Sequence, residues 1–408
     1  MIQVAIMGHG VVGCGVAELL QHNAAVIAGK AGEQLKIAKI LDLRDFPELT
    51  YAELFTHRFE DIVENPEIQI VVETMGGLHP AYDYVKACLD AGKSVVTSNK
   101  ELVAQKGDEL LALAKAHKQN FLFEASVGGG IPILRPLDQC LSANRIQRIA
   151  GILNGTTNFM LTEMIENGLS FDEALADAQN RGYAERDPSA DVDGLDACRK
   201  ICILASLGFG NHVYPDEVHT EGIRNITLTD VRCAEAAGGV IKLIGLAVRE
   251  DEHIRALVAP MVVKKDNMLS HIGGVFNGVQ VTGDAVGDTL FYGRGAGKEP
   301  TASAVVADVI DAAKHLGRSK YLHWGPQVPG LVADYQALPM SYMVRLAGET
   351  REAAAAAATA VFEEIAPVSA DVADNEFVFI TPELSESDFE DKTALLKGVT
   401  LVSRIRLL

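Results

Sequence analysis

The segment Gly8-His9-Gly10-Val11-Val12-Gly13 constrains the fold of this chain more than any other feature. It matches the pattern G-x-G-x-x-G, follows directly on an apolar stretch over residues 2–7 and precedes a helical pattern over residues 11–22. In such a loop the first glycine allows a tight turn, the second lets a pyrophosphate approach the backbone, and the third lets the helix pack on the strand. An ordinary strand-to-helix turn is the alternative, but this setting favours a dinucleotide-binding loop.

The first third of the chain alternates short apolar segments with longer amphipathic ones, which is typical of a parallel sheet covered by helices. The candidate strands are residues 2–7, 37–43, 68–74, 94–97 and 121–125, and the candidate helices are residues 11–22, 81–91 and 102–117. This order predicts a Rossmann-type, doubly wound α/β domain over residues 1–131.

The pattern changes at Gly128, where a glycine cluster and two prolines precede polar helices and glycine-rich strands. We expect a second, α+β domain over residues 132–296, with strands near 256–263 and 278–282, and then a helix at 301–316. Residues 339–408 show the order β-α-β-β-α-β of a ferredoxin-like unit. Its expected strands are 340–346, 368–372, 376–381 and 400–407, and its expected helices are 351–366 and 386–396.

Composition excludes several classes of protein. The chain has 408 residues, enough for two or three domains, and its 48% hydrophobic and 22% charged residues are typical of folded globular proteins. A net charge of −19 opposes binding to nucleic acid and to anionic membranes. The six cysteines are scattered along the chain, which indicates reduced thiols. Neither a signal peptide nor a long apolar span is visible in the sequence. We therefore expect a cytoplasmic protein.

The choice of dinucleotide depends on where the second strand ends. If it ends at Leu43, Arg44 turns toward the ribose and favours the 2′-phosphate of NADP; if it ends earlier, Asp42 points there and favours NAD. The sequence leans to NADP and leaves NAD open. Thr74 and Ser98, at the ends of the next two strands, are further candidates for cofactor binding.

Lys100 follows Ser98 closely, at the edge where open α/β sheets place their ligands, so it could reach a nicotinamide or a substrate. A solvated lysine at a helix start, with Ser98 or Asn99 as N-cap, is the simpler alternative. Further along, the three glycines at 128–130 could expose carbonyl groups to a cation or bend around a ligand, and a hinge between domains is equally plausible.

Residues 182–200 form the densest polar stretch of the chain. Asp196 and Lys200 are four residues apart on a helix whose continuation is apolar, so they share one face of a helix that is largely buried. A lysine held beside a carboxylate in this way is positioned rather than mobile. Cys198 and Cys202 have the same spacing, but no second pair accompanies them, so core packing explains them better than a metal.

Six segments occur in order along the chain: GHGVVG, SNKELVAQKG, EASVGGGIPIL, GILNGTTNFML, GYAERDPSADVDGLDACRK and GRGAGKEPTASAVVAD. By these segments the sequence resembles homoserine dehydrogenases over residues 1–320. The segment Asn154-Gly155-Thr156-Thr157-Asn158 and the block from Glu185 to Lys200 are typical of that family rather than of Rossmann proteins in general. The resemblance implies a reversible, NAD(P)H-dependent reduction of L-aspartate 4-semialdehyde to L-homoserine, a step of threonine and methionine biosynthesis.

The resemblance also implies catalytic and substrate-binding residues. Lys200 matches the proton donor, and Lys100 matches a lysine near the nicotinamide. Glu185 and Asp196 match the acids that hold the substrate, and Gly182 lies in a loop that closes on it. Because the lysine must be neutral to accept a proton in the reverse direction, we expect homoserine oxidation to be favoured at a higher pH than reduction.

A monovalent cation, typically sodium, is a further implication of the resemblance. The matching main-chain carbonyl groups belong to Glu124, Val127, Gly129 and Ile131. Gly297 matches a second closing loop, and the helix at 297–320 is expected to return to the first domain. Members of the family are commonly homodimers or homotetramers, so we expect a homo-oligomer that binds small molecules.

The last unit departs from the family pattern. Many members end in an ACT domain whose first strand leads to an Asp-x-Pro-Gly-Val-Leu turn, whereas here Ser341–Leu346 is followed by Ala-Gly-Glu-Thr-Arg-Glu. We expect a degenerate ACT-like unit that responds weakly or not at all to threonine. A semialdehyde dehydrogenase that forms a thioester is one alternative, but none of the six cysteines lies in a loop with a nearby histidine that could serve as its base. An NAD(P)-binding regulatory sensor with an ACT-like tail is the other, and it would need no cluster of Glu185, Asp196 and Lys200.

Overall fold

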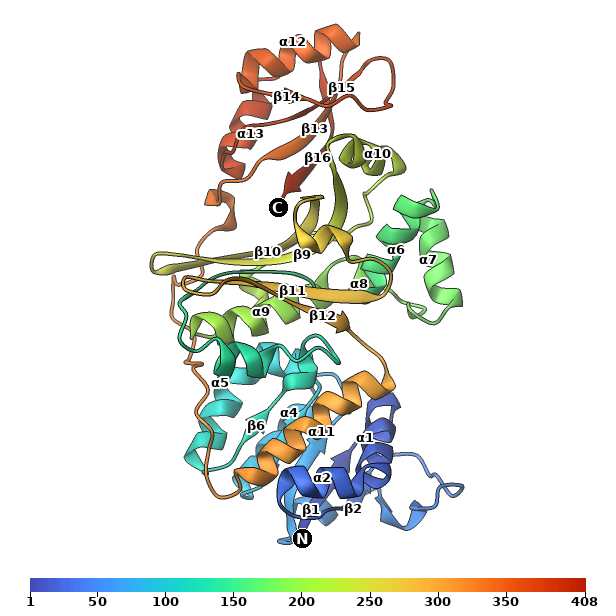
Figure 1. Cartoon of the computed structure of the whole chain (residues 1–408), viewed down its shortest axis with the longest axis vertical. Coiled ribbons are helices and arrows are strands. Elements are labelled where there is room, and N and C mark those ends of the chain that lie inside the picture. The colour runs from blue at the N-terminus through green and yellow to red at the C-terminus, as the bar shows by residue number, and fades with distance from the viewer. The chain divides into compact units, whose positions relative to one another are not determined.

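The computed structural model describes all 408 residues, which divide into two compact units (Figure 1). The first unit contains residues 1–146, 202–215 and 282–329, and the second contains residues 147–201, 216–281 and 330–408. Each unit is therefore built from segments that are far apart in the sequence.

The first unit contains a parallel sheet with the strand order β3-β2-β1-β4-β5-β6. Its strands are β1 (Ile2–Met7), β2 (Leu35–Leu41), β3 (Phe55–Thr56), β4 (Ile68–Glu73), β5 (Ser94–Thr97) and β6 (Phe121–Leu122). The direction of winding reverses between β1 and β4, and open sheets bind ligands at the carboxyl ends of the strands at such a point. The prediction of a Rossmann-type parallel sheet is confirmed.

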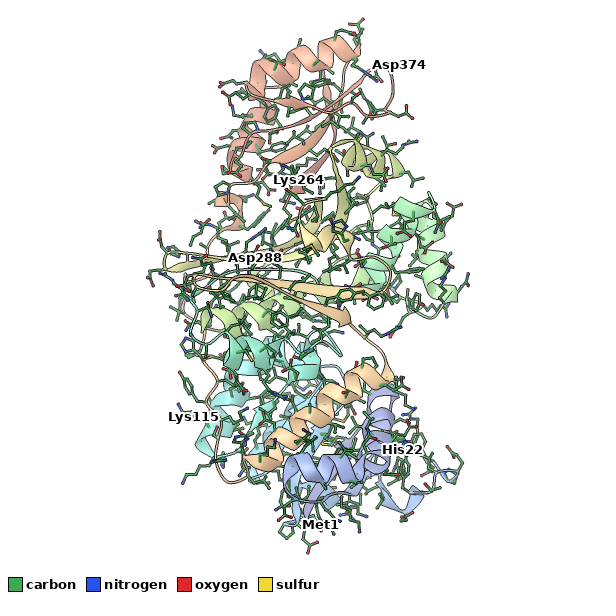
Figure 2. The ribbon with its side chains drawn as sticks, in the orientation of Figure 1. Met1, His22, Lys115, Lys264, Asp288 and Asp374 are labelled. Carbon is green, nitrogen blue, oxygen red and sulfur yellow. The ribbon has the colours of Figure 1, made fainter.

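The helices of this unit are α1 (Val11–His22), α2 (Ala24–Ala31), α3 (Glu60–Val63), α4 (Ala81–Asp90), α5 (Lys100–Ala116) and α11 (Lys298–Lys314). The strand β12 (Gly287–Arg294) precedes α11. Helix α11 lies against α1, which ends at His22, the residue labelled in Figure 2. Gly15 permits this approach, because a Cβ atom there would lie 3.0 Å from the Cβ atom of Ala302.

Several expected boundaries in the first unit are wrong. The second strand ends at Leu41 rather than at residue 43. The strand expected over 121–125 stops at Leu122, and a single 3₁₀ turn occupies Glu124–Ser126. The short helix α2 was not expected at all, because its run of alanines lacks the amphipathic spacing that marks a surface helix.

The second unit contains a mixed sheet with the order β11-β7-β9-β10-β16-β13-β15-β14, and β8 also pairs with β10. Its strands are β7 (Ile146–Ile152), β8 (His219–Thr220), β9 (Gly239–Glu250), β10 (His253–Lys264), β11 (Phe276–Gly283), β13 (Tyr342–Ala347), β14 (Ala366–Pro367), β15 (Glu376–Ile380) and β16 (Thr400–Leu407). The longest pairing is the antiparallel hairpin β9–β10, whereas β10 and β16 run parallel. The strand expected over 368–372 is wrong, since β14 is only Ala366–Pro367.

The helices of the second unit are α6 (Gly155–Glu166), α7 (Phe171–Asn180), α8 (Ser189–Val192), the first part of α9 (Leu195–Phe209), α10 (Leu228–Ala236), α12 (Arg351–Phe362) and α13 (Glu386–Ala394). Large buried side chains of β13, α12, β15 and α13 pack in one core with residues of β9 and β10. Buried ion pairs join the last strands to the rest of this unit, and Arg406 contacts both Glu221 and Glu386.

Glu221 shows how strongly these contacts favour the charged carboxylate. Burial alone would raise the pKa of Glu221, but hydrogen bonds from His219 and Arg406 and the charge of Arg406 outweigh it and lower the pKa to about 2.

No single helix of the chain is long and apolar enough to cross a membrane; only the bent pair α1 and α2 meets those criteria together.

Candidate active site

The glycine loop after β1 has the geometry of a phosphate-binding turn. Gly8 adopts a φ of 94°, which side chains with a Cβ atom rarely allow. A Cβ atom at Gly13 would lie 2.0 Å from the carbonyl oxygen of Gly8 and 2.8 Å from Oγ1 of Thr74, so only glycine fits where α1 crosses β1. Thr74 Oγ1 donates to that same carbonyl at 2.9 Å and holds the loop in place.

The start of α1 is open to a ligand. A Cβ atom at Gly10 would meet nothing within 4 Å, and Gly10 as N-cap offers no side chain to the first turn of the helix. Val11 is exposed and Val12 is half-buried. Because the first backbone N–H groups of a helix favour negative charge, this turn fits the pyrophosphate of a dinucleotide.

Asp42 and Arg44 lie together beside the glycine loop. Since β2 ends at Leu41, Asp42 is the first residue after the strand, which is the condition under which it faces a ribose. Its carboxylate accepts hydrogen bonds from the backbone N–H of His9 at 2.7 Å and from Nε of Arg44 at 2.9 Å. Burial alone would raise the pKa of Asp42, but these hydrogen bonds lower it to about 2.

Glu73 is a residue of this edge that sequence reasoning missed. It ends β4, is fully buried, and accepts hydrogen bonds from Thr97 Oγ1 and from the backbone N–H of Met75 at 2.7 Å. Burial raises its pKa despite these donors. The one available signal was a glutamate at the end of an otherwise apolar strand.

Lys100 is the first residue of α5 and is partly exposed, and Ser98 precedes it after β5. Asn99 caps the helix by accepting a hydrogen bond from the backbone N–H of Leu102, as the simpler alternative for this segment expected. The Asn99 amide also donates to the carbonyl of Gly77 at 2.6 Å. A side-chain hydrogen bond thus joins the start of α5 to the loop that follows β4.

The loop proposed from the sequence as a cation site is buried and tightly bent. Val127, Gly129 and Ile131 are buried, and Gly129 has a φ of 54°. The carboxylate of Glu124 accepts hydrogen bonds from the backbone N–H groups of three consecutive residues that begin at Ile133. Its side chain therefore holds this loop against the segment that follows it.

The same loop touches the segment that leads to α11. The backbone N–H of Gly130 donates to the carbonyl of Arg294, and a Cβ atom at Gly129 would lie 2.5 Å from the carbonyl oxygen of Gly295. Gly297 is the N-cap of α11, with a φ of 120°. The cation loop and one of the two closing loops expected from the sequence are therefore neighbours in the first unit.

In the second unit, Asp196 and Lys200 form a buried ion pair on α9. Lys200 Nζ donates to Asp196 Oδ2 at 2.7 Å and to the carbonyl of Leu153 at 2.8 Å. Lys200 is 8% exposed and Asp196 is 3% exposed, so both charged groups are largely shielded from bulk water. This contact agrees with the helical spacing seen in the sequence.

Asn154 completes the cluster and is a second residue that the site prediction missed. Its Nδ2 atom donates to Asp196 Oδ2 at 2.8 Å and to Asp191 Oδ1 at 2.7 Å. Its Oδ1 atom accepts from the backbone N–H of Thr157 and so caps α6. One side chain therefore begins a helix and fixes the carboxylate that holds Lys200.

Gly182 and Glu185 lie on the exposed stretch between α7 and α8, in the same unit as the ion pair. Gly182 has a φ of 75°, and the carbonyl of Glu185 accepts a hydrogen bond from Gln179. The structure places both residues at the surface, outside the buried Asp196–Lys200 cluster.

Comparison with known proteins relates both halves of this arrangement to one family. Two family models match the chain: the NAD-binding domain of homoserine dehydrogenase over residues 8–124, and homoserine dehydrogenase over residues 132–310. A homoserine dehydrogenase of Pseudomonas aeruginosa is 43% identical over 343 residues, which are 83% of this chain and 79% of that protein. The chain belongs to the homoserine dehydrogenase family.

Solved structures of the family extend the similarity to the whole chain. A homoserine dehydrogenase from Thiobacillus denitrificans has a TM-score of 0.90 at 38% identity and covers 100% of this chain and 98% of its own. A hyperthermophilic archaeal homoserine dehydrogenase in complex with NADPH has a TM-score of 0.66 at 30% identity, over 76% of this chain and 97% of its own. The chain is an NAD(P)-dependent oxidoreductase of this family, and a purely regulatory sensor is not favoured.

Proposed function

We propose that the chain catalyses the reversible reduction of L-aspartate 4-semialdehyde to L-homoserine, with Lys200 as proton donor and acceptor. The observation that carries this proposal is the buried Asp196–Lys200 pair, fixed by Asn154 and by the carbonyl of Leu153. Lys100, at the start of α5, helps to place the substrate. Glu185 and Gly182 belong to an exposed segment that would close on the bound substrate.

The reduced nicotinamide supplies the hydride when it is bound. Negative charge then develops on the aldehyde oxygen, and the Nζ atom of Lys200 stabilises that charge and donates the proton. Asp196 and the Leu153 carbonyl keep Nζ in one position, so little reorganisation is needed at that moment. In the reverse direction neutral Lys200 accepts the hydroxyl proton of homoserine.

For the cofactor, we propose NADP with NAD as an alternative. Gly8, Gly10, Val11, Val12 and Gly13 form the turn that fits the pyrophosphate, with support from Thr74, Ser98 and Gly297. In the described conformation Arg44 forms an ion pair with Asp42, at a strand end that would suit NAD. The Arg44 side chain is exposed, however, and could turn from Asp42 to a 2′-phosphate without unpacking the core.

A monovalent cation, sodium in the first place, is proposed for the carbonyl groups of Glu124, Val127, Gly129 and Ile131. The positive φ values of Gly128 and Gly129 support this, since they bend the backbone as carbonyl convergence requires. Hard cations of this kind prefer oxygen ligands. Activity in sodium, potassium and tetramethylammonium chloride at equal ionic strength tests the assignment.

We propose the remaining organisation from the sequence. Residues 1–131, with the helix at 297–320, form the NAD(P)-binding domain, and residues 132–296 form the catalytic and dimerisation domain of a cytoplasmic homodimer or homotetramer. Residues 339–408 form a degenerate ACT-like unit. The strand order β16-β13-β15-β14 with two helices supports a ferredoxin-like arrangement, and the missing Pro-Gly turn supports insensitivity to threonine.

The first experiment follows NADPH absorbance with L-aspartate 4-semialdehyde. We expect turnover in the wild type and a loss of kcat of about 10²- to 10⁴-fold in Lys200→Met, the range ascribed to a general acid. Binding of NADPH should change little, because the Rossmann-type domain is intact in that variant. If kcat of Lys200→Met stays within a few fold of the wild type in both directions, Lys200 is not the proton donor.

A further inference from the structure

Lys242 is a buried cation that the proposed reaction does not use. It lies on β9, is 3% exposed, and donates from Nζ to Asn158 Oδ1 at 3.0 Å and to the carbonyl of Ile272 at 2.7 Å. Both acceptors are neutral, and no carboxylate forms an ion pair with it. An ammonium group has three N–H donors, so one of them has no partner within the chain.

This arrangement is costly unless something else compensates the charge. Burial lowers the pKa of Lys242 to about 8, and the charge of Glu166 offsets only part of that effect. A buried ammonium without an anion is rare in proteins, because its lost hydration is not replaced. The position therefore suits an anionic group that arrives from outside.

Lys242 lines an open hollow of about 260 Å³ within the second unit. The hollow lies between the last turn of α6, the start of β9 and the 3₁₀ segment Met268–His271, which follows the end of β10 at Lys264, labelled in Figure 2. The Oγ atom of Ser270 is buried there without a hydrogen-bond partner. The lining of the hollow thus includes two polar groups with unused hydrogen-bonding capacity, Ser270 Oγ and one N–H of Lys242.

The other walls limit what could occupy this space. Glu166 is exposed at the rim, at the C-terminal end of α6, where both its carboxylate and the helix carbonyl groups favour a positive group. Ile165 and Val240 provide apolar surface, and His271 lies at the edge. Inorganic dianions are disfavoured by Glu166, and simple amines are disfavoured by Lys242.

We propose that this hollow is a binding site for a small α-amino acid zwitterion. Its carboxylate accepts hydrogen bonds from Lys242 Nζ and Ser270 Oγ, its ammonium group faces Glu166, and a small side chain contacts Ile165 and Val240.

Contacts within the second unit connect this site to the Asp196–Lys200 pair. The Asn158 side chain that accepts from Lys242 also donates to the carbonyls of Ile272, Gly274 and Phe276, and its backbone N–H donates to the carbonyl of Asn154. Asn154 in turn fixes Asp196. A ligand that draws Lys242 away from Asn158 would alter the first turn of α6, so occupancy should change kcat. This consequence for activity rests on the proposed function, whereas binding does not.

Isothermal titration calorimetry of the full chain with glycine and L-serine tests the proposal. Acetate, which has only the carboxylate, and ethylamine, which has only the ammonium group, are the comparison ligands. We expect binding to weaken about tenfold or more in Lys242→Met, as for loss of a charge-assisted hydrogen bond, and to persist in Lys200→Met. Loss of binding in Lys200→Met alone would place the amino acid at the proposed active site and overturn the inference. Absence of binding by either amino acid throughout the millimolar range would also overturn it.

Glu166 provides a surface variant that does not threaten folding. Glu166→Gln should weaken the binding of glycine about tenfold and leave the binding of acetate unchanged, because only the contact with the ammonium group is lost. Glu163→Gln is the matched control: Glu163 lies on the same helix, contacts Asn167 and does not line the hollow. Equal effects of the two variants would refute the assigned orientation and with it the zwitterion site. Because titration needs no turnover, a failure here is distinguishable from a failure of the proposed reaction.

Discussion

Asn154 offers a sharp test of how the catalytic lysine is positioned. Its Oδ1 atom caps α6, while its Nδ2 atom donates to Asp196 and Asp191. Asn154→Ser keeps a good N-cap, since serine and asparagine are about equally effective there, but it removes both donated hydrogen bonds. The substitution therefore separates the stability of the helix from the orientation of Asp196.

The expected loss follows from one charge-assisted hydrogen bond to a buried acceptor. Asp196 is 3% exposed, so water cannot readily replace the missing donor. Such a bond contributes about 1.5–3 kcal/mol, which corresponds to roughly 10- to 150-fold in rate if Asp196 must stay in place in the transition state. We expect this loss in kcat rather than in the KM for NADPH. The kcat of Asn154→Asp should fall further, because the substitution places a second negative charge next to Asp196.

Steady-state kinetics in both directions and thermal denaturation make the test. Asn154→Ser should unfold close to the wild type, whereas Asn154→Ala also loses the cap and should be about 0.5–2 kcal/mol less stable. A kcat of Asn154→Ser within threefold of the wild type would refute the reasoning. So would a fall in kcat that follows stability across the serine and alanine variants.

Three further predictions concern other parts of the chain. Gly13→Ala should weaken the binding of NADPH at least tenfold in a fluorescence titration, since its Cβ atom would lie 2.0 Å from a carbonyl oxygen. Gly29→Ala in α2, with open space around it, should leave the affinity for NADPH unchanged. Arg44→Ala should lower the ratio of kcat/KM for NADPH to that for NADH; an unchanged ratio would exclude Arg44 as the 2′-phosphate ligand. The lowered pKa of Glu221 stabilises the fold above about pH 4.5, and this is lost as the pH falls toward 2. Wild type should therefore lose about 1–2 kcal/mol more than Glu221→Gln between pH 5 and 2.5 in urea denaturation, a value reduced for the 36% exposure of that side chain.

Local patterns allowed much of the fold and part of the site to be predicted. The glycine loop is a short-range signal, because turn, helix start and close packing are all set within six residues. Asp196 and Lys200 could be paired from helical spacing alone. Asn154 could not be joined to Asp196 in this way, because 42 residues separate them and only the tertiary fold brings them into contact.

Strand ends were the least predictable feature, with a consequence for the cofactor. The sequence placed the end of the second strand at residue 43, but pairing stops at Leu41, where Asp42 begins to accept hydrogen bonds from the glycine loop. That contact joins residues 33 positions apart and has no local signal. For Glu73 the donor on β5, Thr97, is 24 residues away and has no local signal, whereas the donor at Met75 is only two residues away.

The first unit is built from three separate stretches of sequence, and this affects how it can fold while the chain is being synthesised. Helix α11 supplies Val305 and Val309 to the same core as Val16 and Leu20 of α1. At about 5–20 residues per second, a ribosome takes roughly 8 to 34 seconds to pass from residue 146 to the end of α11 at Lys314. During that interval the part of α1 that α11 covers in the folded unit stays exposed on the nascent chain. A fragment that stops at residue 146 keeps every residue of the glycine loop and lacks the helix that closes its core.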